Sequence, residues 1–266
     1  MQSFSADALK SGEGAAVASE SVAPPPVPSD MVTIAPGVHF NTIAREWRMK
    51  CSAENDKQSL QSVQQALESM LPQIHAIDGV KSVQRVVCGG SLDYRVIVAL
   101  PADKFGAWEA AQFAPEEAFL SAVRGVEGVG LVETQTYTLM PVLTRARTAP
   151  EMSTIAPGVV YNTIAKEWRM KWSQDNDKQS LQAIQAAFDA VLPQLKGVSG
   201  VKSIQRIVCG GCLDYKIIVA LPADKWVDWM KADFAPEAEF LAAVGGIEGV
   251  SAVESQPYTL MSIAAP

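Results

Sequence analysis

VKSVQRVVCGGSLDYRVIVAL at residues 80–100 and VKSIQRIVCGGCLDYKIIVAL at residues 201–221 are the stretches that decide the fold. Each contains two runs of β-branched residues joined across Gly-Gly, which predicts a β-hairpin. We expect Gly89–Gly90 and Gly210–Gly211 to supply the positive φ that a tight turn needs. The second run of each stretch is almost continuously apolar, so that strand should be covered on both faces. Helices on one side cannot do this, and the candidate for the other side is the second copy of the stretch.

The chain carries an internal repeat. Residues 33–142 align with residues 154–263 without a gap, and 70 of the 110 aligned positions are identical. A group present in both copies can belong to a shared site, whereas a group present in one copy cannot belong to a duplicated site. Residues 1–32, rich in Ala, Ser, Gly and Pro, predict a disordered N-terminal tail, with a segment that orders on a partner as the alternative. Residues 143–153 predict a polar linker.

Each copy shows the same order of expected elements. Residues 42–51 alternate between apolar and polar side chains and predict a first strand. Residues 55–74 carry apolar side chains three or four positions apart and predict a helix that Pro72 kinks or ends. After the hairpin, a second helical region is interrupted at Ala114-Pro115. A last strand is expected near residues 129–140.

The resulting order, β-α-β-β-α-β, is that of the ferredoxin-like unit. Its usual strand order of 4-1-3-2 places the third strand inside the sheet, as the apolar run requires. It places the fourth strand at an edge, as Pro257 in the second copy requires. The sequence therefore predicts an α+β protein of tandem, duplicated ferredoxin-like domains (residues 33–142 and 154–263), with antiparallel sheets, helices on one face and pseudo-two-fold symmetry.

Composition narrows the classes of partner. The 266 residues are 48% hydrophobic and 19% charged, with a formal net charge of −7. Without a cluster of Lys or Arg, neither nucleic acid nor an anionic membrane surface is expected as a partner. No apolar run approaches the roughly 20 residues of a membrane-spanning helix, so membrane insertion is not expected. Four cysteines in a chain of this length favour a reducing compartment.

Charged side chains alternate with apolar ones along the expected first strand. They are Glu46, Arg48 and Lys50 in the first copy and Glu167, Arg169 and Lys171 in the second. Charges on an alternating strand usually face solvent, yet this strand is predicted to be central. We therefore give equal weight to a paired contact between domains or subunits.

Aromatic side chains at helical spacing recur in the second helical region, as Trp108 with Phe113 and as Trp229 with Phe234. Such a stripe more often belongs to a core than to an interface. We carry both interpretations forward. The candidate contacts for assembly or between domains are Glu46, Arg48, Lys50, Trp108, Phe113, Tyr137, Glu167, Arg169, Lys171, Trp229, Phe234 and Tyr258.

Cys209-Gly-Gly-Cys212 is a CxxC motif, typical of a redox pair or of half a zinc site. The first copy has Cys88 and Ser91 at the equivalent positions, and no second CxxC completes a zinc site. We interpret the motif as small residues at a tight turn. An enzyme that uses the cysteine pair is the alternative.

No duplicated set of catalytic groups is apparent. His39 and His75 each occur in one copy only, so the commonest general base is not shared. Asp93 and Asp214 recur beside the hairpin turn, where an acid is normally a cap and a ligand-binding carboxylate is the alternative. We therefore predict no catalytic residue, no metal ligand and no cofactor.

Two families resemble the sequence. The pattern VxxxxRxVCGGxLDY with the closing GVxxVExQxYTLM resembles the ligand-sensing domain of the Lrp/AsnC regulators, at Gly90, Asp93, Tyr94, Gly128–Val129 and their counterparts. That resemblance implies a ferredoxin-like fold that pairs into α/β barrels. Across both copies, the motifs NTIAxEWRMK, NDKQSLQ, VCGGxLDY, LPADK, FAPE and YTLM resemble the pyrenoid shell proteins of diatoms and related algae.

The second resemblance implies a plastid protein that tiles into a sheet around the Rubisco-filled pyrenoid. On it we expect a non-catalytic structural protein of the chloroplast stroma that self-assembles into a shell at the pyrenoid periphery, in a carbon-concentrating mechanism. Its partners would be copies of itself, with Rubisco or other pyrenoid proteins in addition. Uncovered edge strands and an apolar sheet face would supply the contacts. The alternatives are a small-molecule-binding α/β-barrel sensor and, third, an enzyme using the CxxC.

Overall fold

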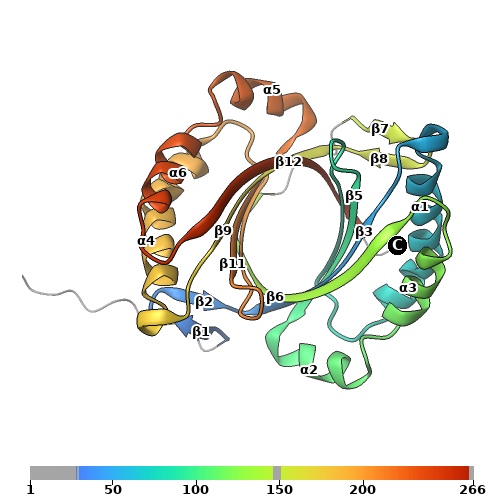
Figure 1. Cartoon of the computed structure of the whole chain (residues 1–266), viewed down its shortest axis with the longest axis horizontal. Helices are drawn as coiled ribbons and strands as arrows, with labels where there is room; N and C mark the ends of the chain where they lie inside the picture. The colour runs from blue at the N-terminus through green and yellow to red at the C-terminus, as the bar shows by residue number, and fades with distance from the viewer. Residues whose placement is uncertain (1–27, 29, 146–150, 264–266) are drawn as a thin grey trace, which may run out of the picture.

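A computed structural model describes residues 28, 30–145 and 151–263. The expected disordered tail therefore lies almost wholly outside the described residues, as does the middle of the expected linker. Two groups of helices flank a central ring of strands (Figure 1). The expected α+β fold, with an antiparallel sheet and helices on one face, is confirmed.

The two halves of the chain repeat one order of elements. The first half contains β1 (Val32–Ala35), β2 (Val38–Phe40), β3 (Thr42–Lys50), α1 (Glu54–His75), β4 (Ser82–Val87), β5 (Asp93–Pro101), α2 (Ala102–Ala110), α3 (Glu116–Arg124) and β6 (Gly130–Thr144). The second half contains β7 (Ser153–Ala156), β8 (Val159–Tyr161), β9 (Thr163–Lys171), α4 (Asp175–Gly197), β10 (Ser203–Val208), β11 (Asp214–Pro222), α5 (Ala223–Lys231), α6 (Glu237–Gly245) and β12 (Ser251–Ile263).

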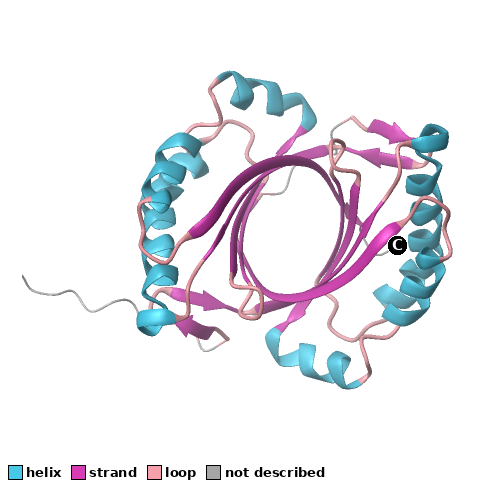
Figure 2. Ribbon diagram, viewed as in Figure 1, coloured by secondary structure: helices cyan, strands magenta, loops and turns pink. Residues whose placement is uncertain are grey.

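The eight long strands form one closed barrel, in the order β10-β11-β9-β12-β4-β5-β3-β6. Figure 2 shows this closed ring with the helices outside it. Within each half the order is the expected 4-1-3-2, but β6 also pairs with β10 and β12 also pairs with β4. The prediction of two separate sheets, each ending at the fourth strand, is therefore wrong. The cause is the length of that strand, because β6 continues to Thr144 and its added residues pair with the other half.

Pro257 shows how a closed barrel accommodates a proline. The residue lies in β12, opposite Lys166 of β9. On the other side of β12, pairing with β4 begins only at Thr259, which faces the last residue of β4, Val87. Pro257 thus has a neighbouring strand on one side only, which is the condition under which a strand tolerates the missing N–H.

The hairpins β4–β5 and β10–β11 are confirmed, but their turns differ from the expectation. Positive φ occurs at Leu92 (54°) and Leu213 (57°), not at the Gly-Gly pairs. The Leu92 N–H donates to the carbonyl of Cys88, and the Cys88 N–H donates to the carbonyl of Asp93. These bonds close a longer turn, whose left-handed residue is the one before the second strand.

Two short hairpins, β1–β2 and β7–β8, were not predicted, and each covers the opposite half. Ala35 and Val38 are buried in the core of the second half, and Ala156 and Val159 are buried in the core of the first. Figure 1 accordingly shows β1 and β2 beside α4, and β7 and β8 beside α1. The local signal was the sequence Ala-Pro-Gly-Val, present in both copies, in which Pro and Gly favour a tight turn.

The start of each long helix also departs from the expectation. Asn55, Asp56 and Lys57 all have positive φ, and so do their counterparts in α4. The left-handed turn directs Lys57 to the opposite half, where its Nζ atom donates to the carbonyl of Ile155 across 3.3 Å. Asn55 and Asp56, where the helix was expected to start, therefore form a separate left-handed turn. Through Lys57 this turn contacts the hairpin β7–β8 of the other half.

Candidate functional site

Alternate residues of the barrel strands point into the barrel, and those at one end are charged. Strand register places Lys50 beside Asp93, and Arg48 beside both Arg95 and Glu133. We call this region the charged end. It comprises Glu46, Arg48, Lys50, Asp93, Arg95 and Glu133 with their counterparts Glu167, Arg169, Lys171, Asp214, Lys216 and Glu254.

Ion pairs connect neighbouring strands at the charged end. Asp93 accepts hydrogen bonds from Arg48 Nη2 at 2.8 Å and from Lys50 Nζ at 2.9 Å. Burial alone would raise the pKa of Asp93, but these two cations outweigh it and hold the pKa below its ordinary value. In the other half, Lys171 Nζ lies 2.7 Å from Asp214 Oδ1. The two ion pairs of Asp93 therefore favour its ionised form.

Two buried tyrosine–glutamate pairs lie deeper in the barrel. Tyr137 donates to Glu46 Oε2 at 3.0 Å, and Tyr258 donates to Glu167 Oε2 at 3.3 Å. Arg95 Nη1 of the first half lies 3.6 Å from Glu167 Oε2 of the second half. The charged strand residues thus meet inside the barrel, with a contact that joins the halves.

The two glutamates differ in their second oxygen. Gln256 Nε2 donates to Glu167 Oε1 at 2.9 Å, but its counterpart Gln135 donates instead to Cys212 Sγ at 2.8 Å. Within the described part of the chain, Glu46 Oε1 receives no hydrogen bond. The difference follows from Cys212, which replaces a serine of the first copy.

The surroundings of Glu167 favour its ionised form. Burial alone would raise the pKa of Glu167, but Lys216, Arg95 and the amide of Gln256 together lower it below its ordinary value. Glu46 keeps the tyrosine but lacks the amide. Neither glutamine was predicted from the sequence. The available signal was that Gln135 and Gln256 recur at equivalent positions of the two copies.

A pocket of about 450 Å³ lies at the charged end, with Glu46 in its lining. Both halves contribute to its lining, which consists of Glu46, Arg48, Glu133, Thr134, Gln135, Cys212 and Asp214. Its volume lies within the roughly 300–1,000 Å³ of small-molecule sites. The lining therefore combines the carboxylate of Glu46 with the guanidinium group of Arg48 and the sulfur-bearing side chain of Cys212.

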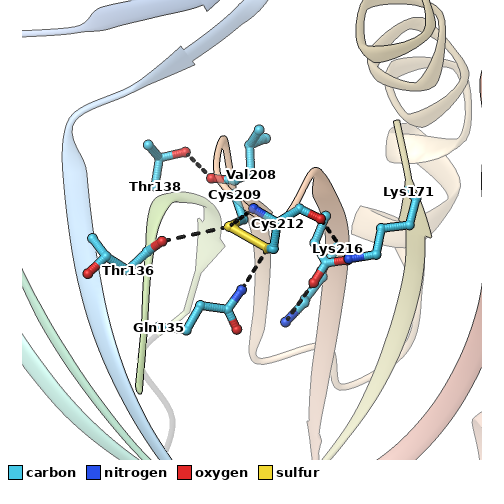
Figure 3. Close-up of a disulfide and its surroundings, with 9 residues drawn as sticks. Gln135, Thr136, Thr138, Lys171, Val208, Cys209, Cys212 and Lys216 are labelled. Carbon is cyan, nitrogen blue, oxygen red and sulfur yellow. Dashed lines mark hydrogen bonds and ion pairs between the residues drawn. A yellow bond between two sulfur atoms is a disulfide. The ribbon is translucent and has the colours of Figure 1, made fainter. Parts of the chain in front are cut away.

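Cys209 and Cys212 form a disulfide at the β10–β11 turn. Figure 3 shows Gln135 pointing at this disulfide and Lys171 reaching the same turn, where its Nζ atom lies 2.6 Å from the carbonyl oxygen of Cys212. The interpretation of the motif as small turn residues was therefore incomplete. Cys51 and Cys88 are free and buried, and burial raises the pKa of Cys51 to about 11.

The predicted aromatic contacts lie elsewhere. Trp108 and Trp229 are buried between a helix and the outer wall of the barrel, each at right angles to a phenylalanine, Phe113 or Phe234. Their indole N–H groups donate to backbone carbonyls of their own half. These four residues belong to the cores beneath α2 and α5, as the core interpretation of the stripe expects, and they make no contact between the halves through these bonds.

The described residues contain no group of three or more His, Cys, Asp or Glu side chains placed to hold a metal ion. None of the helices they form is both long enough and apolar enough to cross a membrane.

Solved structures share this fold at low sequence identity. A "Putative monooxygenase" from Fusobacterium nucleatum matches with a TM-score of 0.57 and 8% identity, over 83% of this chain and 93% of its own. One from Lactobacillus acidophilus matches with a TM-score of 0.52 and 9% identity, over 83% and 94%. An anthrone oxidase-like protein matches with a TM-score of 0.50 and 13% identity, over 84% and 92%. No protein-family model and no curated protein matches the sequence.

These findings correct the expected function. The shell hypothesis needed uncovered edge strands and an apolar sheet face, but the eight long strands close on each other and the second sheet face lines the barrel interior. The structures that share the fold are described as monooxygenases or oxidase-like, not as shell components. The expectation of a non-catalytic, self-assembling protein is therefore wrong.

Proposed function

We propose that the chain is an enzyme that binds a small organic molecule at the charged end of the barrel and removes a proton from it, with Glu46 as the base. The observation that carries the proposal is the free Oε1 atom of Glu46. This side chain is only 4% exposed, yet it lines the pocket and receives one hydrogen bond where its counterpart receives two.

The surroundings of Glu46 suit a base. Tyr137 holds its other oxygen and so fixes the direction of the free one. A general base must lie within hydrogen-bond reach of the proton that it takes, and the pocket gives a substrate that access. Arg48 also lines the pocket, and its cation would stabilise negative charge that develops on the substrate.

The substrate class follows from this chemistry. A carboxylate can deprotonate a phenol or a carbon acid next to a carbonyl group, particularly where a neighbouring cation stabilises the anion. The fold neighbours described as monooxygenases and as an anthrone oxidase-like protein support this direction, since an anthrone is itself a weak carbon acid. The pocket volume admits a molecule of that size.

We further infer that the two halves are duplicated copies of one ferredoxin-like unit. Support comes from the 70 identities in 110 aligned positions and from the repeated order of elements. Because the copies are joined in one chain, they can diverge independently. On this proposal one glutamate keeps a structural role, and the other performs the chemistry.

Proton abstraction can be measured directly by deuterium incorporation at the acidic carbon, followed by proton NMR. The probes are anthrone, a β-diketone and a β-keto ester. We expect the chain to accelerate exchange for at least one probe, Glu46→Gln to lower the rate by about 10²-fold or more, and Glu167→Gln to retain it. No acceleration with any probe, or equal rates for Glu46→Gln and the wild type, would overturn the proposal.

A further inference from the structure

We infer that Cys209 and Cys212 form a redox-active pair that exchanges with small thiols entering through the pocket at the charged end. This inference stands on the disulfide and its contacts and does not depend on proton abstraction by Glu46. The two sulfur atoms differ in access, because Cys212 is half-buried and lines the pocket whereas Cys209 is 3% exposed.

Each sulfur atom already has an N–H donor. The backbone N–H of Cys212 donates to Cys209 Sγ at 3.1 Å, and the amide of Gln135 donates to Cys212 Sγ at 2.8 Å. Hydrogen bonds of this kind are stronger to a thiolate than to a neutral sulfur atom. The two donors would therefore stabilise the thiolates that form when the disulfide is reduced.

Two lysines and an aspartate lie beside the same turn. Lys171 contacts the carbonyl oxygen of Cys212 and also pairs with Asp214. Lys216 lies on the same side of the turn, 3.8 Å from the other oxygen of Asp214 (Figure 3). Asp214 thus lies between two cations next to the turn.

The geometry assigns an order to the two steps. An incoming thiolate attacks the accessible Sγ of Cys212, the Cys209–Cys212 bond breaks, and Cys209 leaves as a thiolate held by the N–H of Cys212. A second thiolate then attacks the small-molecule sulfur of the mixed disulfide and releases Cys212. In total, two thiols are oxidised to one disulfide, and the protein disulfide takes up their two protons and two electrons to become a dithiol.

The first half supplies the matched control. There, Cys88 faces Ser91, so no second sulfur is present, and Cys88 Sγ lies 3.7 Å from the carbonyl oxygen of Pro257. Cys212→Ser converts the second turn into the sequence of the first. Cys88→Ser removes a buried thiol that has no part in the exchange.

The test uses the full chain purified without reductant and equilibrated in buffers of reduced and oxidised glutathione. Samples are quenched in acid, denatured, alkylated with N-ethylmaleimide and analysed by peptide mass spectrometry. We expect Cys209 and Cys212 to become labelled together as the buffer grows more reducing, with Cys51 and Cys88 labelled throughout. Cys88→Ser should keep this behaviour, and Cys212→Ser should abolish it.

Two results would overturn the inference. The first is complete labelling of Cys209 and Cys212 in the oxidised sample, which would show that no disulfide forms. The second is a disulfide that glutathione reduces only after urea has unfolded the chain, which would show a structural bond. Either result can occur with or without deuterium exchange at a carbon acid, so the two proposals can fail separately.

Discussion

The side-chain amide of Gln135 donates a hydrogen bond to the Sγ atom of Cys212 across 2.8 Å. Its counterpart, Gln256, donates to the carboxylate of Glu167 across 2.9 Å. The two equivalent glutamines therefore have different acceptors, and this makes the two sides of the charged end unlike each other. Cys212 and Glu46 both line one pocket at this end.

Gln135→Leu should shift the thiol–disulfide equilibrium of Cys209–Cys212 toward the disulfide. The variant removes a hydrogen bond to the thiolate, and bonds to charged groups contribute about 1.5–3 kcal/mol, so a shift of about tenfold or more is expected. The measurement is the glutathione titration described above. Gln256→Leu is the control and should leave the equilibrium unchanged; equal shifts in both variants would contradict the assigned contact.

Val38→Ala should destabilise the half to which its hairpin does not belong. Val38 is 0% exposed in the core of the second half, and removing its two methyl groups should lower the free energy of unfolding by about 2 kcal/mol. Urea unfolding gives the total effect, and hydrogen exchange locates it in α4. Val32→Ala, on a residue 47% exposed, should have little effect. Loss of protection in α1 instead of α4 would show that the hairpin β1–β2 does not pack on the second half.

Gly200→Ala should lower the free energy of unfolding by about 1–2 kcal/mol, because φ there is +82° and the left-handed region is costly for other residues. The added Cβ would also lie 2.7 Å from Lys225 Cγ. Gly197→Ala meets no atom within 4 Å and lies at the end of α4, so it should be neutral or stabilising by less than ~1 kcal/mol. Equal midpoints in urea for the two variants would contradict this difference.

Asp93→Asn should flatten the acid limb of the stability profile. The pKa of Asp93 is lowered in the folded state by Lys50 and Arg48 against the effect of burial, so the carboxylate stabilises the fold above the unfolded pKa of about 3.9. That stabilisation is lost as the pH falls through the folded pKa, below about 4. Urea unfolding between pH 7 and pH 2 should show a lower free energy for the variant at neutral pH and a smaller loss in acid. Parallel profiles would exclude this role.

Local patterns predicted most of the elements. The alternation in residues 42–51 and the β-branched runs around Gly89–Gly90 specify strands whose buried faces the structure confirms. The same patterns could not predict closure of the barrel, since it depends on the pairing of Thr144 with Ser203, which lie far apart in the chain. The short hairpin that ends at Phe40 was missed for the same reason, because what it covers belongs to the other half.

The site depended even more on distant contacts. Glu46 was selected as a charged strand residue, but its free oxygen exists only because Gln135 turns toward Cys212, 77 residues away in sequence. The CxxC motif was visible, but its disulfide was not predicted, because the first copy lacks the second cysteine. A difference between two repeats is therefore as informative as a shared residue, once the fold brings the differing position to a pocket.

Each short hairpin, β1–β2 and β7–β8, packs on the opposite half, and this affects how the chain folds during synthesis. When only the first half has left the ribosome, the cover of α1 has not yet been made, and β1–β2 has no α4 on which to dock. The nascent first half would therefore wait with exposed apolar surface until translation delivers its counterpart. The two halves would then complete their folding together.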